Sequence, residues 1–164
     1  MALQSQEKRK GLIETIKNLF LPYISEREEL IKLLNENYSK EVAIAKMMDE
    51  HAEIIPFDFL KERLKRVAEE ERKHAEMLRQ KIVELGGSVN PTPKVFEIKL
   101  DSIHNEKGFR KLIADLEFDK EIYEDYISQI NKIENDDVKD LLRRIVDDEI
   151  KHKDVLMDLV MRLC

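Results

Sequence analysis

The chain has 164 residues, a formal net charge of −6, 39% charged residues and only four glycines and four prolines. This composition predicts one mostly helical domain with a core of its own, and the acidic balance argues against a nucleic-acid-binding surface. A single cysteine, Cys164, excludes a disulfide framework and a Cys-x-x-Cys metal site within the chain. No apolar run reaches membrane-spanning length and the N-terminus lacks a signal-peptide pattern, so we expect a cytoplasmic protein.

The first predicted element is a short amphipathic helix over residues 5–21, which Pro22 is expected to stop. Its apolar side chains share one side, with lysines and glutamates on the other: Leu12, Ile13, Ile16, Leu19 and Phe20. We expect this helix to pack on the main domain or on a second subunit, with membrane-surface binding as the alternative. Residues 1–24 are therefore predicted as an N-terminal amphipathic helix that precedes a domain over residues 25–164.

A long helix is predicted next, over residues 25–54, beginning with a capping-box pattern at Ser25 and Glu28. The expected buried stripe of this helix is Leu30, Leu34, Tyr38, Ala45, Met48 and Ala52. Glu41 lies within the stripe, and a buried carboxylate needs a basic partner from another helix or a metal. His51 lies off the stripe centre, so we expect it to be partly exposed or to support a ligand, not to be one.

The second long helix is predicted over residues 57–85, running back antiparallel after a corner at Pro56. Its buried stripe is expected to contain Leu60, Leu64, Val67, Leu78 and Leu85. Glu71 and His74 lie in the same stripe, three residues apart, which places them on one face about a turn apart. A carboxylate and an imidazole are therefore predicted to point into the core.

A long connection follows, over residues 88–107, and its length suits a crossover between two parallel helices. We expect it to be extended and to pack along the bundle, with His104 on the surface. The third helix, over residues 106–133, has a predicted stripe of Leu112, Leu116, Tyr123, Tyr126 and Ile130, and Asp119 falls inside it. The fourth helix is predicted to start at the turn Asn135-Asp136-Asp137 and to run to about Leu163.

Glu149 and His152 repeat the spacing of Glu71 and His74, 78 residues later and in the same register of apolar residues. A single Glu-x-x-His is weak evidence in a chain rich in glutamate, but its recurrence indicates an internal repeat. The same offset of 78 residues maps Asp119 onto Glu41. The repeat therefore predicts two helix pairs that each supply inward carboxylates and an imidazole.

A carboxylate on the first long helix, Glu-x-x-His on the second, a carboxylate on the third and Glu-x-x-His on the fourth resembles the ferritin-like di-iron carboxylate proteins. The resemblance covers residues 25–164, and the run from Ala68 to Leu78 is most similar to rubrerythrins; the segment from Glu41 to Ala52 also resembles bacterioferritin. It implies an all-α, ferritin-like antiparallel four-helix bundle with one long crossover between helices 2 and 3, plus the short N-terminal helix. The implied metal ligands are Glu41, Glu71, His74, Asp119, Glu149 and His152.

The resemblance further implies two iron ions, with manganese or a mixed pair as alternatives, since carboxylate-rich sites accept several metals. In this interpretation Glu71 and Glu149 bridge the ions, Glu41 and His74 complete one end, and Asp119 and His152 complete the other. The implied function is a rubrerythrin-like oxidoreductase that reduces peroxide or oxygen, uses a separate electron-donor protein and forms a homodimer. Iron binding or storage without turnover is the alternative, and no catalytic residues are expected beyond the ligands.

Some residues depart from the family pattern. Asp119 replaces the usual glutamate, and Leu116 and Ile122 stand near the position where rubrerythrins have a second glutamate. Arg72 occupies the position of bacterioferritin's haem-binding methionine, so no haem is expected. A rubredoxin-like domain needs four cysteines and is not expected either. Glu117 is an alternative third-helix ligand, but the repeat selects Asp119.

Overall fold

The computed structural model describes the backbone of residues 2–55, 57–90 and 109–163, and the side chains of residues 23, 25–55, 57–90, 116, 117 and 120–162. These described residues form four helices: α1 (Ala2–Ala52), α2 (Asp58–Glu84), α3 (Phe109–Ile130) and α4 (Asp136–Leu163). The described residues contain no strand. The expected all-α, ferritin-like four-helix bundle is therefore confirmed.

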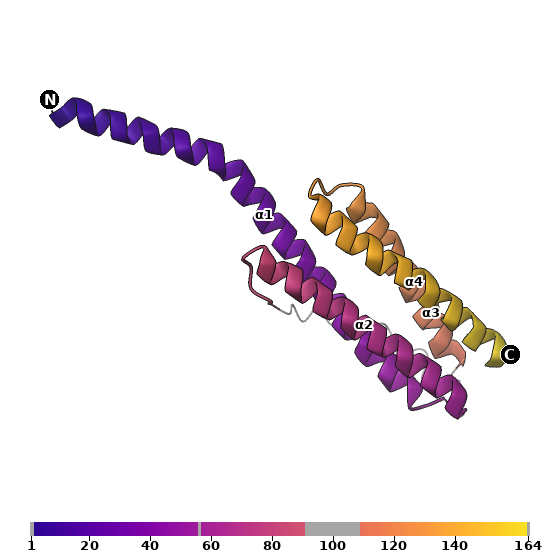
Figure 1. The fold of residues 1–164 in the computed structure, drawn as a ribbon. Helices are drawn as coiled ribbons and strands as arrows, with labels where there is room; N and C mark the ends of the chain where they lie inside the picture. Colours follow the sequence, from indigo (N-terminus) through magenta and orange to yellow (C-terminus); the bar gives the residue numbers. More distant parts are fainter. Residues whose placement is uncertain (1, 56, 91–108, 164) are drawn as a thin grey trace.

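Two antiparallel hairpins make up the bundle, because α1 packs mainly against α2 and α3 mainly against α4. Figure 1 shows that α2 and α3 run in the same direction, as expected for helices joined by a long crossover. The crossover itself, residues 91–108 with His104, lies outside the described residues. No helix in the described part of the chain carries an apolar stretch long enough to span a bilayer.

The expected break at Pro22 is wrong, because α1 is one continuous helix of 51 residues. A proline inside a helix removes one backbone hydrogen bond and presses its ring against the preceding turn, which bends a helix without necessarily ending it. Figure 1 shows α1 changing direction along its length. Ser25 and Glu28 consequently lie inside the helix, where both are exposed, and do not cap it.

The end of α2 follows the glycine pair that the sequence places there. Gly86 has φ +73° and its N–H donates to the Val83 carbonyl at 2.8 Å, while the Gly87 N–H donates to the Ile82 carbonyl at 2.9 Å. These two bonds form a Schellman motif, which favours glycine at the left-handed position. A Cβ at Gly87 would lie 2.7 Å from Ile31, so glycine also permits close approach to α1.

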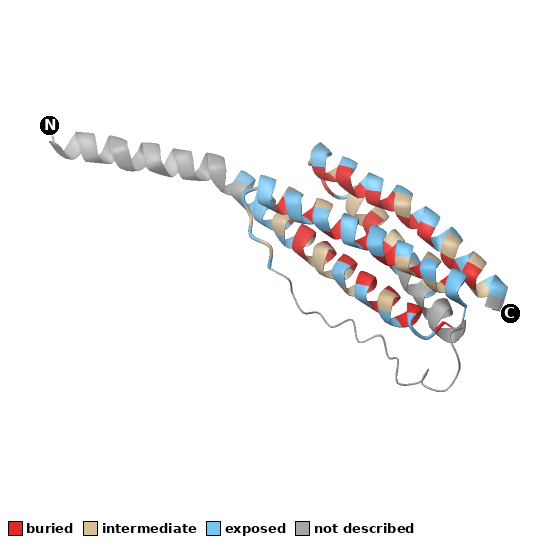
Figure 2. Cartoon of the chain, turned by 60° about the horizontal axis from the view of Figure 1, so that its bottom comes forward, coloured by how far each residue is buried: buried red, intermediate tan, exposed pale blue. Residues whose placement is uncertain are grey.

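The core occupies the inner faces of all four helices, shown in red in Figure 2. The predicted stripes are confirmed wherever their side chains are described, although Leu85, Tyr38, Leu116, Tyr123 and Ile130 are only partly buried. Complete burial of one leucine or isoleucine side chain contributes roughly 1.5–3 kcal/mol. Core residues with no accessible surface include Leu34, Met48, Leu60, Leu64, Leu78, Val138, Leu142, Ile145 and Leu156.

Candidate metal centre

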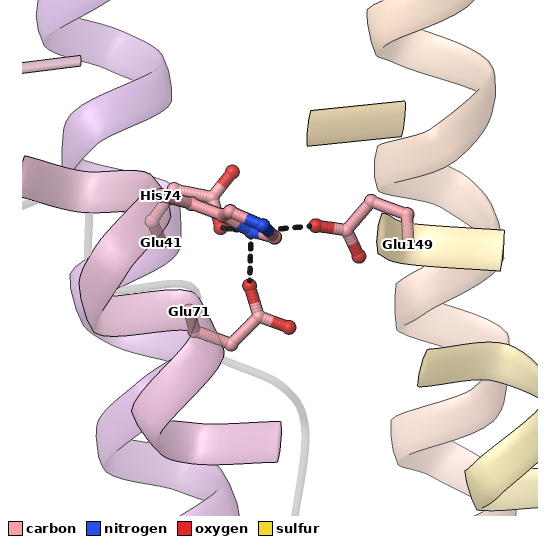
Figure 3. Close-up of side chains that lie close together, drawn as sticks. All are labelled: Glu41, Glu71, His74 and Glu149. Atoms are coloured by element: carbon pink, nitrogen blue, oxygen red, sulfur yellow. Dashed lines mark hydrogen bonds and ion pairs between the residues drawn. The ribbon is translucent and has the colours of Figure 1, made fainter. Parts of the chain in front are cut away.

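Five polar side chains from three helices meet in the middle of this apolar core. Glu41 comes from α1, Glu71 and His74 from α2, and Glu149 and His152 from α4, and none is more than 2% exposed. Each lies at the stripe position predicted from the sequence, so the same periodicity that buries leucines above and below also buries these ligand-type groups. In Figure 3 Glu41, Glu71, His74 and Glu149 point toward one another.

His74 lies at the centre of the first group. Its Nδ1 is 3.2 Å from Glu71 Oε2, 3.2 Å from Glu149 Oε1 and 3.9 Å from Glu41 Oε2. One ligand atom from each of these four residues lies within 4.8 Å of the others. A single ion placed among them would therefore contact three carboxylates and one imidazole.

His152 occupies the equivalent place in the second half of the repeat. Its Nδ1 is 2.8 Å from Glu71 Oε1 and 3.6 Å from Glu149 Oε2. The two imidazole rings have centroids 5.5 Å apart and are inclined by 31°. Glu71 and Glu149 therefore lie between two histidines, each with an oxygen near either ring.

Two carboxylates outside the cluster contact the Nε2 atoms of the histidine rings, on the side opposite Nδ1. Glu70 Oε2 is 2.7 Å from Nε2 of His152, and Asp148 Oδ2 is 3.5 Å from Nε2 of His74. The arrangement is crosswise, because the acid that precedes each motif's glutamate contacts the histidine of the other motif. The hydrogen bond at His152 Nε2 and the longer ion-pair contact at His74 Nε2 leave both Nδ1 atoms directed at the cluster and favour one orientation of each ring.

Tyr126 of α3 donates its phenolic hydrogen to Glu41 Oε1, and its side chain is 1% exposed. The sequence places Tyr126 in the apolar stripe as a packing residue, and its contact with Glu41 was not predicted. A buried tyrosine usually finds a polar partner, which is the signal that could have revealed this bond. Glu70 and Asp148 were missed as well, although they too lie 78 residues apart.

Burial and the paired charges strongly shift the protonation of the cluster. Burial, with the charges of Glu71 and Glu149, raises the pKa of Glu41 well above its ordinary value. Burial opposes the charged forms of His74 and His152, but the carboxylates of Glu149 and Glu71 outweigh it and raise the two pKa values to about 9 and about 11. Burial likewise opposes ionisation of Glu71, yet His152 and His74 lower its pKa to about 2. Without metal, both imidazoles therefore carry protons at neutral pH, and Glu41 is the carboxylate that gives up its charge most readily.

The polar atoms of the cluster would be better satisfied by bound metal ions than they are by their contacts with one another. Among the described residues, four buried atoms make no hydrogen bond of good geometry: Glu41 Oε2, Glu71 Oε1, Glu149 Oε1 and His152 Nδ1. Two of them, His152 Nδ1 and Glu71 Oε1, are nevertheless 2.8 Å apart, and Glu149 Oε1 is 3.2 Å from His74 Nδ1, so their contacts are close but poorly aligned. Unsatisfied polar atoms are rare in protein interiors because each costs about 1–3 kcal/mol. Carboxylate oxygens with imidazole nitrogens form a donor set that suits iron, manganese or zinc. Metal ions bound on the two sides of Glu71 and Glu149 would give these atoms partners.

The other residues for which the sequence suggested a role at or near the site do not all have described side chains. The side chain of Asp119 lies outside the described residues, so its ligand role stays a prediction, while the alternative Glu117 is exposed on α3. His51 is buried, with 4% of its surface exposed, and is not part of the four-residue group. Arg72 lies at the surface and pairs with Asp49 and Glu69.

Comparison with known proteins identifies the family. The family model described as Rubrerythrin matches residues 32–160, a range that contains Glu41 and both Glu-x-x-His motifs. The chain belongs to the rubrerythrin family. It is thus a ferritin-like, rubrerythrin-like protein of the di-iron class with a candidate metal site. No curated protein sequence matches it.

Solved structures share the fold of this rubrerythrin-family chain at low sequence identity. Bacterioferritin from Desulfovibrio desulfuricans, described with its di-iron site in different catalytic states, has 21% identity and a TM-score of 0.73, covering 85% of this chain and 82% of its own. The dodecameric thioferritin of Bacteroides fragilis has 21% identity and a TM-score of 0.68, with 84% and 87% covered. A protein of Xanthomonas campestris has 20% identity and a TM-score of 0.72, with 84% and 93% covered.

Proposed function

We propose that this protein is a di-iron carboxylate oxidoreductase that reduces hydrogen peroxide or dioxygen with electrons from a separate donor protein. The observation that carries the proposal is the convergence of both Glu-x-x-His motifs and Glu41 on one buried group of unsatisfied donor atoms. Membership of the rubrerythrin family supports this chemistry. The iron pair would supply reversible redox changes and a binding position for the oxidant.

The placement of the ligands supports a division into shared and terminal roles. Glu71 and Glu149 each have an oxygen near both histidines, so they would be the shared ligands. Glu41 lies beside His74 and would complete that end. The internal repeat assigns Asp119 to the end that contains His152. Glu70 and Asp148 would keep the two imidazoles in the orientation that directs Nδ1 inward.

Iron binding or storage without turnover is the second candidate. The fold shared with bacterioferritin and thioferritin favours it, because their names describe ferritin-type proteins. The two functions predict different fates for iron. An oxidoreductase keeps a fixed amount of iron per chain through many cycles, whereas a storage protein continues to accumulate ferric iron.

Stopped-flow spectroscopy of the reduced, iron-loaded protein tests the proposal. Peroxide should oxidise the protein rapidly, and an added reductant should sustain many turnovers without a rise in bound iron. Glu149→Ala should abolish this reaction, whereas Asp147→Ala, which changes an exposed acid on the same helix, should preserve it. Continued iron accumulation without peroxide turnover would support storage and contradict the proposed activity.

A further inference from the structure

Helix α1 is much longer than the bundle to which it belongs. It has 51 residues, against 27 for α2. At about 1.5 Å per residue, α1 spans about 75 Å and α2 about 40 Å. A short turn joins Ala52 to Asp58, so α2 can pair only with the second half of α1. Figure 1 shows the first half leaving the bundle, and Tyr23, near the exit, is 67% exposed.

The sequence of this first half is amphipathic and mildly basic. Residues 2–21 contain four basic residues (Lys8, Arg9, Lys10, Lys17) and two acidic ones (Glu7, Glu14), a net charge of 4 − 2 = +2. Apolar residues recur at helical spacing from Leu12 to Phe20. An amphipathic helix of about 20 residues has little stability alone and gains it by burying its apolar face on a partner.

A groove of about 620 Å³ lies between the adjoining part of α1 and the end of α3. Leu30, Leu33 and Ile133 supply its apolar lining, and Leu30 and Ile133 also belong to the core. Its acidic residues without an ion-pair partner among the described residues are Glu26, Glu29, Glu36 and Glu134. Asp125 is already paired with Lys40. Leu30 and Ile133 are each only 8% exposed, so the apolar strip is narrow and consists mainly of Leu33. With Lys132 also in the lining, the groove still has an excess of acidic residues, which complements a basic amphipathic helix.

We propose that this groove receives the N-terminal half of α1 from a second copy of the chain, with the two α1 helices antiparallel about a two-fold axis near Tyr23. Such an axis pairs residues whose numbers sum to 46. It brings Ile13 opposite the partner's Leu33 and Ile16 opposite the partner's Leu30.

The same register aligns opposite charges. It pairs Lys10 with the partner's Glu36, Glu14 with the partner's Lys32 and Lys17 with the partner's Glu29, and symmetry repeats every pair. Ile13 and Ile16 thus meet apolar residues and each of these charges meets its opposite, while Leu19 and Phe20, close to the axis, lie opposite the partner's Arg27 and the partner's Glu26.

Charge reversal with rescue tests the register in the full-length protein. Sedimentation equilibrium should show a dimer. Lys10→Glu with Lys17→Glu should raise its Kd by at least about tenfold, and Glu29→Lys with Glu36→Lys should do the same. All four substitutions together should return Kd to within about threefold of the original, because every pair is restored. Glu62→Lys with Glu121→Lys, an equal charge change at exposed sites outside the groove, should have no effect.

A cross-link locates the axis independently. In a Cys164→Ser background, Tyr23→Cys should form a disulfide-linked dimer under mild oxidation, because a residue at a two-fold axis meets its own copy. Lys46→Cys, at an exposed position farther along α1, should remain monomeric on a non-reducing gel.

Three results would overturn the proposal. The first is a monomer at every concentration, including one that instead binds vesicles containing phosphatidylglycerol. The second is a dimer whose Kd is unchanged by the groove substitutions, as expected if residues 91–108 fill the groove. The third is a cross-link from Lys46→Cys with none from Tyr23→Cys.

Discussion

Asp119 is the further ligand that the internal repeat predicts beside the five side chains seen in the cluster. It lies 30 residues before Glu149, as Glu41 lies 30 residues before Glu71. Glu117 is two residues away, about 200° around the helix, and its side chain is exposed. We predict that Asp119→Ala weakens binding of one metal ion by at least about tenfold, while Glu117→Ala leaves both ions bound. Competition titration of both variants measures this, and the reverse pattern would show that the repeat misassigns the ligand.

The pKa values of the cluster predict that metal binding depends on pH. His74 and His152, with pKa values of about 9 and about 11, hold protons at pH 7, and the pKa of Glu41 is raised in the same cluster by burial and by Glu71 and Glu149. A metal ligand must lose its proton, so binding releases protons and affinity rises as pH increases from about 6 to 8. Anaerobic titration calorimetry with Mn²⁺ in buffers of different ionisation enthalpy should show at least about two protons released at pH 7. His152→Ala should release fewer, and release of no protons would contradict the assigned protonation.

At the residue scale, the sequence identified the ligand-type residues in the core but not their supports. Glu41, Glu71 and Glu149 were recognisable because a carboxylate in an apolar stripe requires a partner. Glu70 and Asp148 were missed because a residue one position away points about 100° around the helix and looks solvent-exposed. Each instead contacts a histidine from the neighbouring helix, which only tertiary packing reveals. The hydrogen bond from Tyr126 to Glu41 was not predicted, because the tyrosine ring fits an apolar stripe and the sequence does not show where its hydroxyl points.

At the scale of elements, the helix ends depend on local polar contacts. Asn135 caps α4, because its Oδ1 accepts a hydrogen bond from the Val138 N–H at 3.0 Å. We predict that Asn135→Ala lowers the free energy of unfolding by roughly 1 kcal/mol. Urea denaturation at fixed metal content measures the change, with Glu134→Ala, an exposed neighbour, as the control. Equal stability of the two variants would show that the cap contributes nothing.

The periodicity of apolar residues predicted the type and packing face of each bundle helix, and apart from the start of α1 the boundaries differed by only a few residues. The failure was Pro22. Local propensity indicated a stop, but one missing hydrogen bond is a small loss beside the many that continue the 51-residue helix. The sequence alone could not show whether the cost of the proline or the stability of a continuous helix is larger, since the bend that accommodates a proline depends on the packing around the helix. The N-terminal unit over residues 1–24 stays a prediction.

At the scale of the whole molecule, the site is where the two halves of the repeat meet. Each hairpin supplies one Glu-x-x-His motif, and only their packing places the glutamates of both motifs between two histidines. The apolar residues of the same stripes hold the hairpins in this register. Fold and site are therefore consequences of one pattern.

The most direct test of this account is the metal stoichiometry of the protein. Equilibrium dialysis against ferrous iron without oxygen, followed by elemental analysis, should give two tightly bound ions per chain. Glu71→Ala should lose both ions, because Glu71 lies between the two histidines, whereas Glu69→Ala, an exposed acid on the same helix, should retain both. No bound iron in the unmodified protein, or unchanged binding by the Glu71→Ala variant, would contradict the central claim.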